Sequence, residues 1–363
     1  FMIRFLARHG TLSGGILIFV LAFTNFSIPG VLQLNVFPTE IFAQFGAFFN
    51  VGQAAVLSFP NLIMALILAF WLSRLFREQH RYEMLEFNQS IESLKGWKAI
   101  GVVGFLTLLL LFIIGTPIIT LIYRTGSLNQ FFEAFINMHN QWINSILLAL
   151  TGTLIVCFIT FIMALVARKK PQLQLTFMML LLLPLFVSGS LYAIGLIEVW
   201  NQPVFQGLIY GSPTLLIISY LRFLPVGYFL ISTGLVKIPV QYEEIGQLCG
   251  SKRTVIIRKI IFPLIKTSSF GALLLCFIFC FSELDTAVLT YPPGMETIPV
   301  RIFALLHYGT HETVAALSLW QFLIIIAIVV LFSGRILKWS KNLFLRKTNF
   351  ASTNLHSTTH TTE

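Results

Sequence analysis

The sequence has few charged residues and almost no aspartate. Only 10% of its 363 residues are Asp, Glu, Lys or Arg, and the one aspartate is Asp285. A soluble domain carries about a quarter charged residues. With 56% hydrophobic residues and a mean hydropathy of +0.85, the chain has more apolar surface than a single water-soluble core can bury. Composition therefore excludes an ordinary soluble domain and indicates a polytopic membrane protein.

Several motifs of catalysis and cofactor binding are also missing. The four cysteines form neither a CxxC pair nor a disulfide framework. There is no HExxH zinc pair, no GxSxG elbow and no pair of aspartates, which argues against an intramembrane enzyme. No Gly-rich phosphate loop ending in Lys-Ser or Lys-Thr is present. We therefore expect no cofactor or metal in this chain and no ATP binding by it.

What the sequence has instead is a series of long apolar segments. Eight of them are each about 20 residues long, the length that crosses a bilayer as a helix. We expect an all-α bundle with spans at residues 12–32, 51–73, 99–122, 144–167, 174–195, 213–236, 267–290 and 313–334.

Lys and Arg are distributed unevenly between the two sides of these spans. With the N-terminus in the cytosol, 21 of the 24 Lys and Arg lie on the inner side, and only Arg124 and Arg301 lie outside. Positive residues favour cytoplasmic loops, so both termini are expected in the cytosol. This topology accounts for the net charge of +10. The expected surroundings are membrane lipid, and no nucleic-acid partner is needed.

The polar stretch 241–264, QYEEIGQLCGSKRTVIIRKIIFPL, lies between two apolar runs on the basic side. Its pattern predicts two short helices. Glu243 and Glu244 suit the first turn of one helix, where carboxylates complement the helix dipole. Gly250 permits a sharp turn, and Pro263 marks the return into the membrane. A basic loop that only fixes topology is the alternative interpretation.

The spacing in this stretch resembles the EAA loop of ABC importer permeases, E-A-A-x-x-x-G-x9-I-x-L-P. The matching residues are Glu244, Gly250, Ile260 and Pro263. The residues that depart from the motif are Ile245 and Gly246, in place of two Ala, and Phe262, in place of Leu. The resemblance implies that this loop, including Glu243, is the coupling helix that docks in a groove of the ATPase subunit.

A repeat links the two ends of the chain. Residues 40–55, EIFAQFGAFFNVGQAA, are similar to residues 301–316, RIFALLHYGTHETVAA, with Ile-Phe-Ala and Ala-Ala at the same separation. Upstream of each, an apolar span ends in a polar break, at 23–30 (FTNFSIPG) and at 281–288 (FSELDTAV). The first two spans therefore look like a copy of the last two.

The repeat predicts a chain with two homologous halves. Its expected parts are 1–75, the last two spans of an incomplete first half; 76–97, a cytosolic linker; 98–340, a complete six-span half containing the loop 241–264; and 341–363, a disordered cytosolic tail. We expect the first half to be truncated, with its missing spans supplied, if at all, by a separate chain.

The segment 281–309, FSELDTAVLTYPPGMETIPVRIFALLHYG, and the two-half plan resemble the fused permeases of ferric-iron importers. Relatives of these permeases carry thiamine, 2-aminoethylphosphonate or polyamines. The resemblance implies a type I ABC importer bundle in a bacterial inner membrane. It also implies ATPase subunits that hydrolyse ATP on the inside and a periplasmic solute-binding protein outside. Ferric iron is the solute that we expect.

Three ionisable residues lie within the apolar segments, namely Arg222, Glu283 and Asp285. A charge in hydrocarbon is costly, so each should face a partner or a water-filled route. Arg222 paired with Glu283 or Asp285 would line and gate the pathway, or would only fix the contacts between helices. A secondary transporter driven by an ion gradient is the alternative outside the ABC class. It usually has more acidic groups in its spans.

Overall fold

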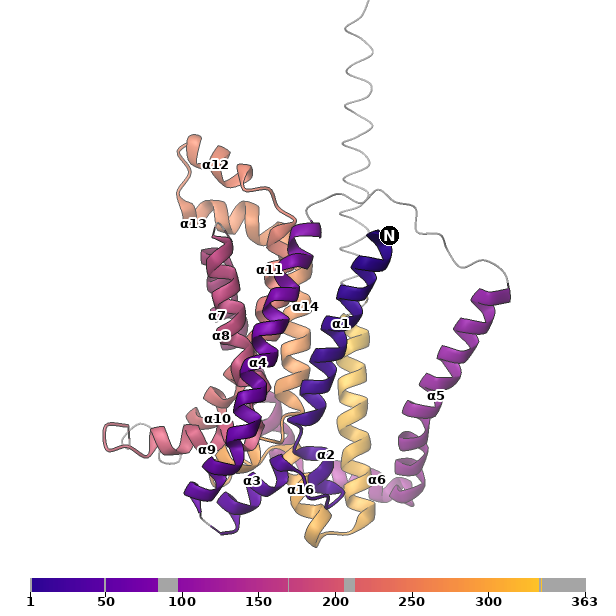
Figure 1. The fold of residues 1–363 in the computed structure, drawn as a ribbon. Coiled ribbons are helices and arrows are strands. Elements are labelled where there is room, and N and C mark those ends of the chain that lie inside the picture. Colours follow the sequence, from indigo (N-terminus) through magenta and orange to yellow (C-terminus); the bar gives the residue numbers. More distant parts are fainter. Residues whose placement is uncertain are drawn as a thin grey trace, which may run out of the picture.

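The computed structural model describes residues 2–48, 50–83, 97–168, 170–205, 213–332 and 334, and these residues form helices and loops without any strand (Figure 1). Seven of the described helices are long and apolar enough to cross a membrane, and one bent pair of helices raises the number to eight. The all-α fold with about eight spans is thus confirmed. The seven spans are Gly14–Val31, Val51–Arg74, Ala99–Thr125, His139–Ala167, Thr214–Val236, Arg253–Phe281 and His311–Phe332.

The elements follow one another as α1 (Met2–Phe23), α2 (Ser27–Val31), α3 (Phe37–Gly46), α4 (Val51–Glu83), α5 (Trp97–Thr125), α6 (Leu128–Asn137), α7 (His139–Ala167), α8 (Pro171–Phe186), α9 (Gly189–Trp200), α10 (Thr214–Ser219), the 3-10 turn η2 (Tyr220–Phe223), α11 (Leu224–Val236), α12 (Gln241–Leu248), α13 (Arg253–Ile256), the π-helical turn η3 (Ile257–Ile261), α14 (Phe262–Phe281), α15 (Ala287–Thr290), α16 (Ile298–Tyr308) and the helix His311–Phe332.

Helices α7, α11 and α14 form the centre of the bundle, each packing on the other two. Glycines allow the close approach, because small residues at helix crossings let backbones come together in a membrane. A Cβ on Gly152 of α7 would overlap the ring of Tyr220, and one on Gly234 of α11 would lie 2.5 Å from Ser268 Oγ. Around this centre, α4 packs on α1, α3 and α8.

Two of the expected spans are wrong in detail, because each contains a break in the helix. The segment expected to cross at 174–195 is bent by 100° between α8 and α9. The span expected at 267–290 ends at Phe281, and a loop and the short α15 follow it. Hydropathy averages over a window, so it does not detect a bend inside an apolar run.

The two segments that are similar in sequence have the same order of elements. A long helix (α1 or α14) is followed by a polar break, a one-turn helix (α2 or α15), a helix that begins with proline at its first turn (α3 or α16), and a final span. The parallel order is what a repeat produces. The expected division of the chain into halves stays a prediction, and α4 continues to Glu83 beyond the expected boundary at residue 75. Most of the linker and the whole tail 341–363 lie outside the described residues.

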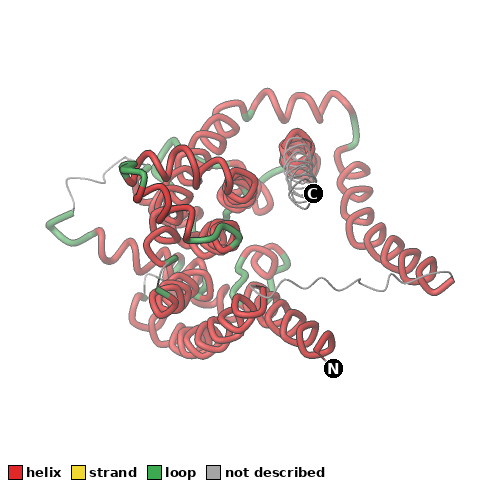
Figure 2. Tube along the Cα trace, turned by 90° about the horizontal axis from the view of Figure 1, so that it is seen from above, coloured by secondary structure: helices red, strands yellow, loops and turns green. Residues whose placement is uncertain are grey.

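Helix α5 stands apart from the centre of the bundle and joins it through α6 (Figures 1 and 2). Within its span Ala99–Thr125, only the last residue, Thr125, is buried against the described part of the chain. Its mean hydropathy of 2.6 suits a helix surrounded by lipid or by other apolar helices.

Replacing Gly152 with Val should destabilise the protein by about 1–3 kcal/mol, the cost of overfilling a well-packed site, because the new side chain meets the buried ring of Tyr220. The unfolding temperature in detergent measures this effect. Gly271→Val in α14 is the matched control, since no atom lies within 4 Å of a Cβ there. Equal shifts in the two variants would contradict the close packing of α7 against Tyr220 of η2.

Candidate functional site

The buried charges gather where helices break. Arg222 lies in the turn η2, and its Nη1 donates to Glu283 Oε1 at 3.0 Å, with the two side chains 5% and 10% exposed. Glu283 lies in the loop after α14, where the same Oε1 accepts from the backbone N–H of Thr286 at 2.9 Å and from its hydroxyl at 2.8 Å. Of the two acidic partners that the sequence left open for Arg222, the structure pairs it with Glu283.

Asp285 joins segments from opposite ends of the chain. Its carboxylate accepts from the backbone N–H of Phe26 at 3.3 Å and from the backbone N–H of Ser27 at 3.1 Å, and the Ser27 hydroxyl also donates to it. These groups lie where α1 gives way to α2. Asp285 thus accepts hydrogen bonds from backbone N–H groups of the first segment, whereas Glu283 accepts a hydrogen bond from a backbone N–H group of its own loop.

The bend between α8 and α9 meets the same cluster. Arg222 Nη2 donates to the carbonyl of Val187 at 3.4 Å, and Ser188 caps α9 by accepting from the N–H of Leu191. A Cβ on Gly189 would overlap both Asp285 and Arg222. Glycine is therefore needed where the bend approaches the charges. Together, Arg222, Glu283 and Asp285 form what we call the charge cluster.

A polar cavity of about 200 Å³ lies beside the charge cluster. Its polar lining consists of Ser27 at the start of α2, Ser282 after α14, and Ser318 and Gln321 of the last described span. Apolar residues form the rest of its wall, namely Val31 of α2, Leu284 of the loop after α14, and Pro299, Ile302, Phe303 and Leu306 of α16. Ser27 connects the two features, because it lines the cavity and also hydrogen-bonds to Asp285.

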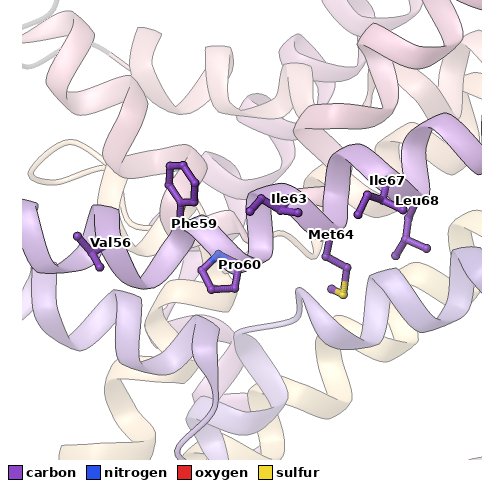
Figure 3. A pocket seen from close by; sticks show the side chains of 7 residues that line it. All are labelled: Val56, Phe59, Pro60, Ile63, Met64, Ile67 and Leu68. Atoms are coloured by element: carbon purple, nitrogen blue, oxygen red, sulfur yellow. The ribbon is translucent and has the colours of Figure 1, made fainter.

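A second hollow, of about 550 Å³, runs along α4 beside Pro60 (Figure 3). Its lining residues are all apolar and all come from α4: Val56, Phe59, Pro60, Ile63, Met64, Ile67 and Leu68. A wall without a polar group offers nothing to hold a hydrophilic solute. This hollow suits an acyl chain or an apolar helix.

The loop 241–264 projects from one end of the bundle, the end at which α1 begins (Figure 1). Glu243 and Glu244 both lie in the first turn of α12, as the sequence predicts. Their surroundings differ. Glu243 is buried and forms an ion pair with Arg168, which also donates to the carbonyl of Ile238, whereas Glu244 is exposed. The ion pair anchors α12 to the end of α7.

Gly250 makes the turn between α12 and α13 with a φ of +73°, in the left-handed region that favours glycine. The expected second short helix is not a separate element, because α13 continues through the π-helical turn η3 into α14. Ile260 lies within that π turn, and Pro263 stands two residues after it, where the hydrogen-bond pattern of the helix already departs from the regular one. Proline here is compatible with an unbroken helix.

The π turn changes which residues face the bundle. Ile256 and Ile261 are both 2% exposed and are five residues apart, whereas a regular helix would bury residues three or four apart. Ile260, which the motif singles out, is only partly buried. The sequence pattern located the loop, but it did not indicate the π turn or the roles of Arg168 and Ser27 as partners of acidic residues. The five-residue spacing of Ile256 and Ile261 was the available signal for the π turn.

Comparison with known proteins gives distant relatives, and no family model matches the chain. It is 25% identical over 293 residues to the Fe(3+)-transport system permease protein FbpB 2 of Haemophilus influenzae, a match that covers 77% of this chain and 56% of that protein. It is 28% identical over 167 residues to PhnV of Salmonella choleraesuis, a permease named for 2-aminoethylphosphonate transport, covering 44% of this chain and 60% of the relative.

The matches thus span less than two thirds of the length of these relatives. Both relatives are named as permease proteins of transport systems and neither as an enzyme. This agrees with the expectation that the chain is not an enzyme. The fold and the comparisons together describe a multi-pass helical membrane protein with distant similarity to transport permeases.

The buried pair Arg222–Glu283 provides a test of the charge cluster. Arg222→Met should cost about 3–5 kcal/mol of stability, because it leaves a buried carboxylate without its partner. The double variant Arg222→Met with Glu283→Gln should cost less than the sum of the two single variants. Unfolding of the purified protein in detergent measures all three. Additive effects would show that the two side chains do not stabilise each other.

Proposed function

We propose that this chain is the membrane-spanning permease of a binding-protein-dependent ABC importer and that α12 with the turn at Gly250 is its coupling loop. The observation that carries the proposal is the surface of α12. Tyr242, Ile245 and Leu248, spaced three residues apart, are 50%, 56% and 87% exposed. They form an apolar stripe on a helix that also carries the buried anchor Glu243.

This stripe is suited to docking in a groove of an ATPase subunit. Residues three apart lie on one face of a helix, and burying an exposed leucine or isoleucine contributes about 1.5–3 kcal/mol. Exposed Glu244 would contact the partner at the rim of such a groove. Gly250 would fix the angle between α12 and α13. The ion pair of Glu243 with Arg168 would hold α12 against the end of α7 when the ATPase subunit displaces the loop.

The helix that follows the loop supplies a path for the movement. From Arg253 to Phe281 the chain is helical without a gap for 29 residues, and the change of direction from α13 to α14 falls at the π turn η3 (Figure 1). Ile260 and Pro263 lie in the first turns of this helix, and Glu283 and Asp285 follow directly after its end. A shift of α12 driven by ATP hydrolysis on the partner would therefore reach the charge cluster. Rocking of packed helices between two arrangements is a common form of such switching.

Ferric iron is our proposed solute, delivered by a periplasmic binding protein across a bacterial inner membrane with both termini in the cytosol. The similarity to FbpB 2 supports this choice because it extends over 77% of the chain, whereas the similarity to PhnV covers 44%. Thiamine, 2-aminoethylphosphonate and polyamines are the alternatives within the same class. Uptake driven by an ion gradient is the alternative outside it.

Docking is tested with Leu248→Asp, which places a charge in the middle of the apolar stripe. We expect the variant to be inserted into the membrane normally. The amount of ATPase subunit that co-purifies with it should be at least tenfold lower than with the wild-type protein, since one buried unpaired charge costs several kcal/mol. Val204→Asp is the matched control, because Val204 is 83% exposed and follows α9, a helix that lies away from α12 in Figure 1. Equal co-purification of both variants would refute the docking surface.

The energy source and the solute are tested together by uptake into cells that express the chain with its ATPase and binding protein. Uptake of ⁵⁵Fe should stop when the catalytic glutamate of the ATPase subunit is replaced, and collapse of the proton gradient with ATP maintained should leave it intact. Accumulation of labelled 2-aminoethylphosphonate but not iron would assign the solute to the alternative. Uptake that persists without ATP hydrolysis would contradict the ABC assignment.

A further inference from the structure

The polar cavity beside the charge cluster lies where the two repeated segments meet. When 23–30 is aligned with 281–288, Ser27 and Asp285 occupy the same position in the repeat. The structure joins these two residues by hydrogen bonds. Equivalent residues of two copies can touch only where the copies face each other about their common axis. In transporters built from repeats, solute sites lie at such an interface.

The hydroxyl groups that line this cavity have already donated their protons elsewhere. Ser27 donates to Asp285, Ser282 donates to the carbonyl of Ile278 at 2.7 Å, and Ser318 donates to the carbonyl of Val314 at 2.8 Å. A hydroxyl has one proton and two acceptor lone pairs. What these three side chains can still offer a ligand is therefore oxygen lone pairs. Gln321 adds an amide oxygen, together with its NH₂.

The charges nearby also favour a ligand that binds to oxygen lone pairs, namely a cation. Asp285 stands directly behind Ser27, and no Lys or Arg is among the residues described as lining the cavity. Arg222, the cation of the charge cluster, is engaged by Glu283 and by the carbonyl of Val187. With two carboxylates and one guanidinium, the ionised cluster has a net charge of −1. A positively charged solute would complement this charge, whereas a phosphonate group would find neither a cation nor a row of donors.

We propose that this cavity is a solute-binding subsite on the transport route and that it selects for small cations. The inference deepens the proposed transport function and rests on it. The subsite lies near the end of the bundle that is remote from α12, where α1 and α14 end. It binds through the oxygen lone pairs of Ser27, Ser282 and Ser318, and Asp285 sets the sign of the charge that enters.

Cysteine labelling with reagents of opposite charge tests the subsite without any partner protein. Gln321→Cys is introduced into the full-length chain carrying Cys249→Ser, which removes the one exposed native cysteine among the described residues. Labelling rates are measured in lipid nanodiscs with trimethylammonium-ethyl and sulfonatoethyl methanethiosulfonate. Thr310→Cys, at an exposed position before the same span, gives the ratio of the two rates at an ordinary surface thiol.

We expect the ratio of cationic to anionic labelling at position 321 to exceed that at position 310 by about tenfold or more, because the Asp285 carboxylate, bound to Ser27 in the wall of the same cavity, attracts one reagent and repels the other. Adding Asp285→Asn should remove most of this excess. Equal ratios at the two positions would overturn the proposal, and so would a lack of labelling by both reagents at position 321. The comparison of positions 321 and 310 in the chain that keeps Asp285 decides the question even if Asp285→Asn fails to fold.

The two proposals fail in different ways. Loss of the labelling preference with normal co-purification of the ATPase would reject the cation subsite and leave the permease assignment standing. A preserved preference without any ATPase partner would reject the assignment to ABC importers and leave a cation route in a transporter of another class.

Discussion

The structure depends on how a helix can be interrupted inside an apolar bundle. Each interruption frees backbone N–H and C=O groups, which cost several kcal/mol each if they stay unpaired away from water. Here three interruptions meet at the charge cluster. Arg222 donates a hydrogen bond to the carbonyl of Val187, and Glu283 accepts one from the N–H of Thr286. Asp285 accepts hydrogen bonds from the N–H groups of Phe26 and Ser27. The buried charges are stabilised by the same bonds, so the breaks and the charges require one another.

This arrangement links two regions that lie far apart in the molecule. At one end, α12 is anchored by Glu243 on Arg168 and presents an apolar stripe. At the other end lie the charge cluster and the polar cavity. The uninterrupted helix Arg253–Phe281 joins them. A hydrogen-bonded helix transmits displacement better than a loop would, so this continuous connection gives the proposed permease a physical means of coupling.

Much of the fold could be predicted from hydropathy and charge, because the bilayer imposes its thickness on every span. The bend at Ser188 could not, since the run around it is largely apolar on both sides, whereas the break after Phe281 is marked by the polar residues of 282–286. Glu243 and Glu244 are neighbours about 100° apart on a helix, and only tertiary structure decides which of them reaches Arg168. The contact of Asp285 with Ser27 joins residues 258 positions apart. The repeat had placed the two at equivalent positions, but their meeting depends on how the copies face each other.

The π-helical turn at Ile257–Ile261 has a consequence for how such a chain can change over evolution. Because the buried face steps by five residues from Ile256 to Ile261 and then by four to Ile265, the turn behaves as one residue inserted into a regular helix. Deleting a residue there would restore ordinary helical spacing and leave every later contact of α14 in place. An insertion would rotate the remainder of the helix by about 100°. Length variation at this point should therefore be strongly asymmetric, with shortening tolerated and lengthening eliminated.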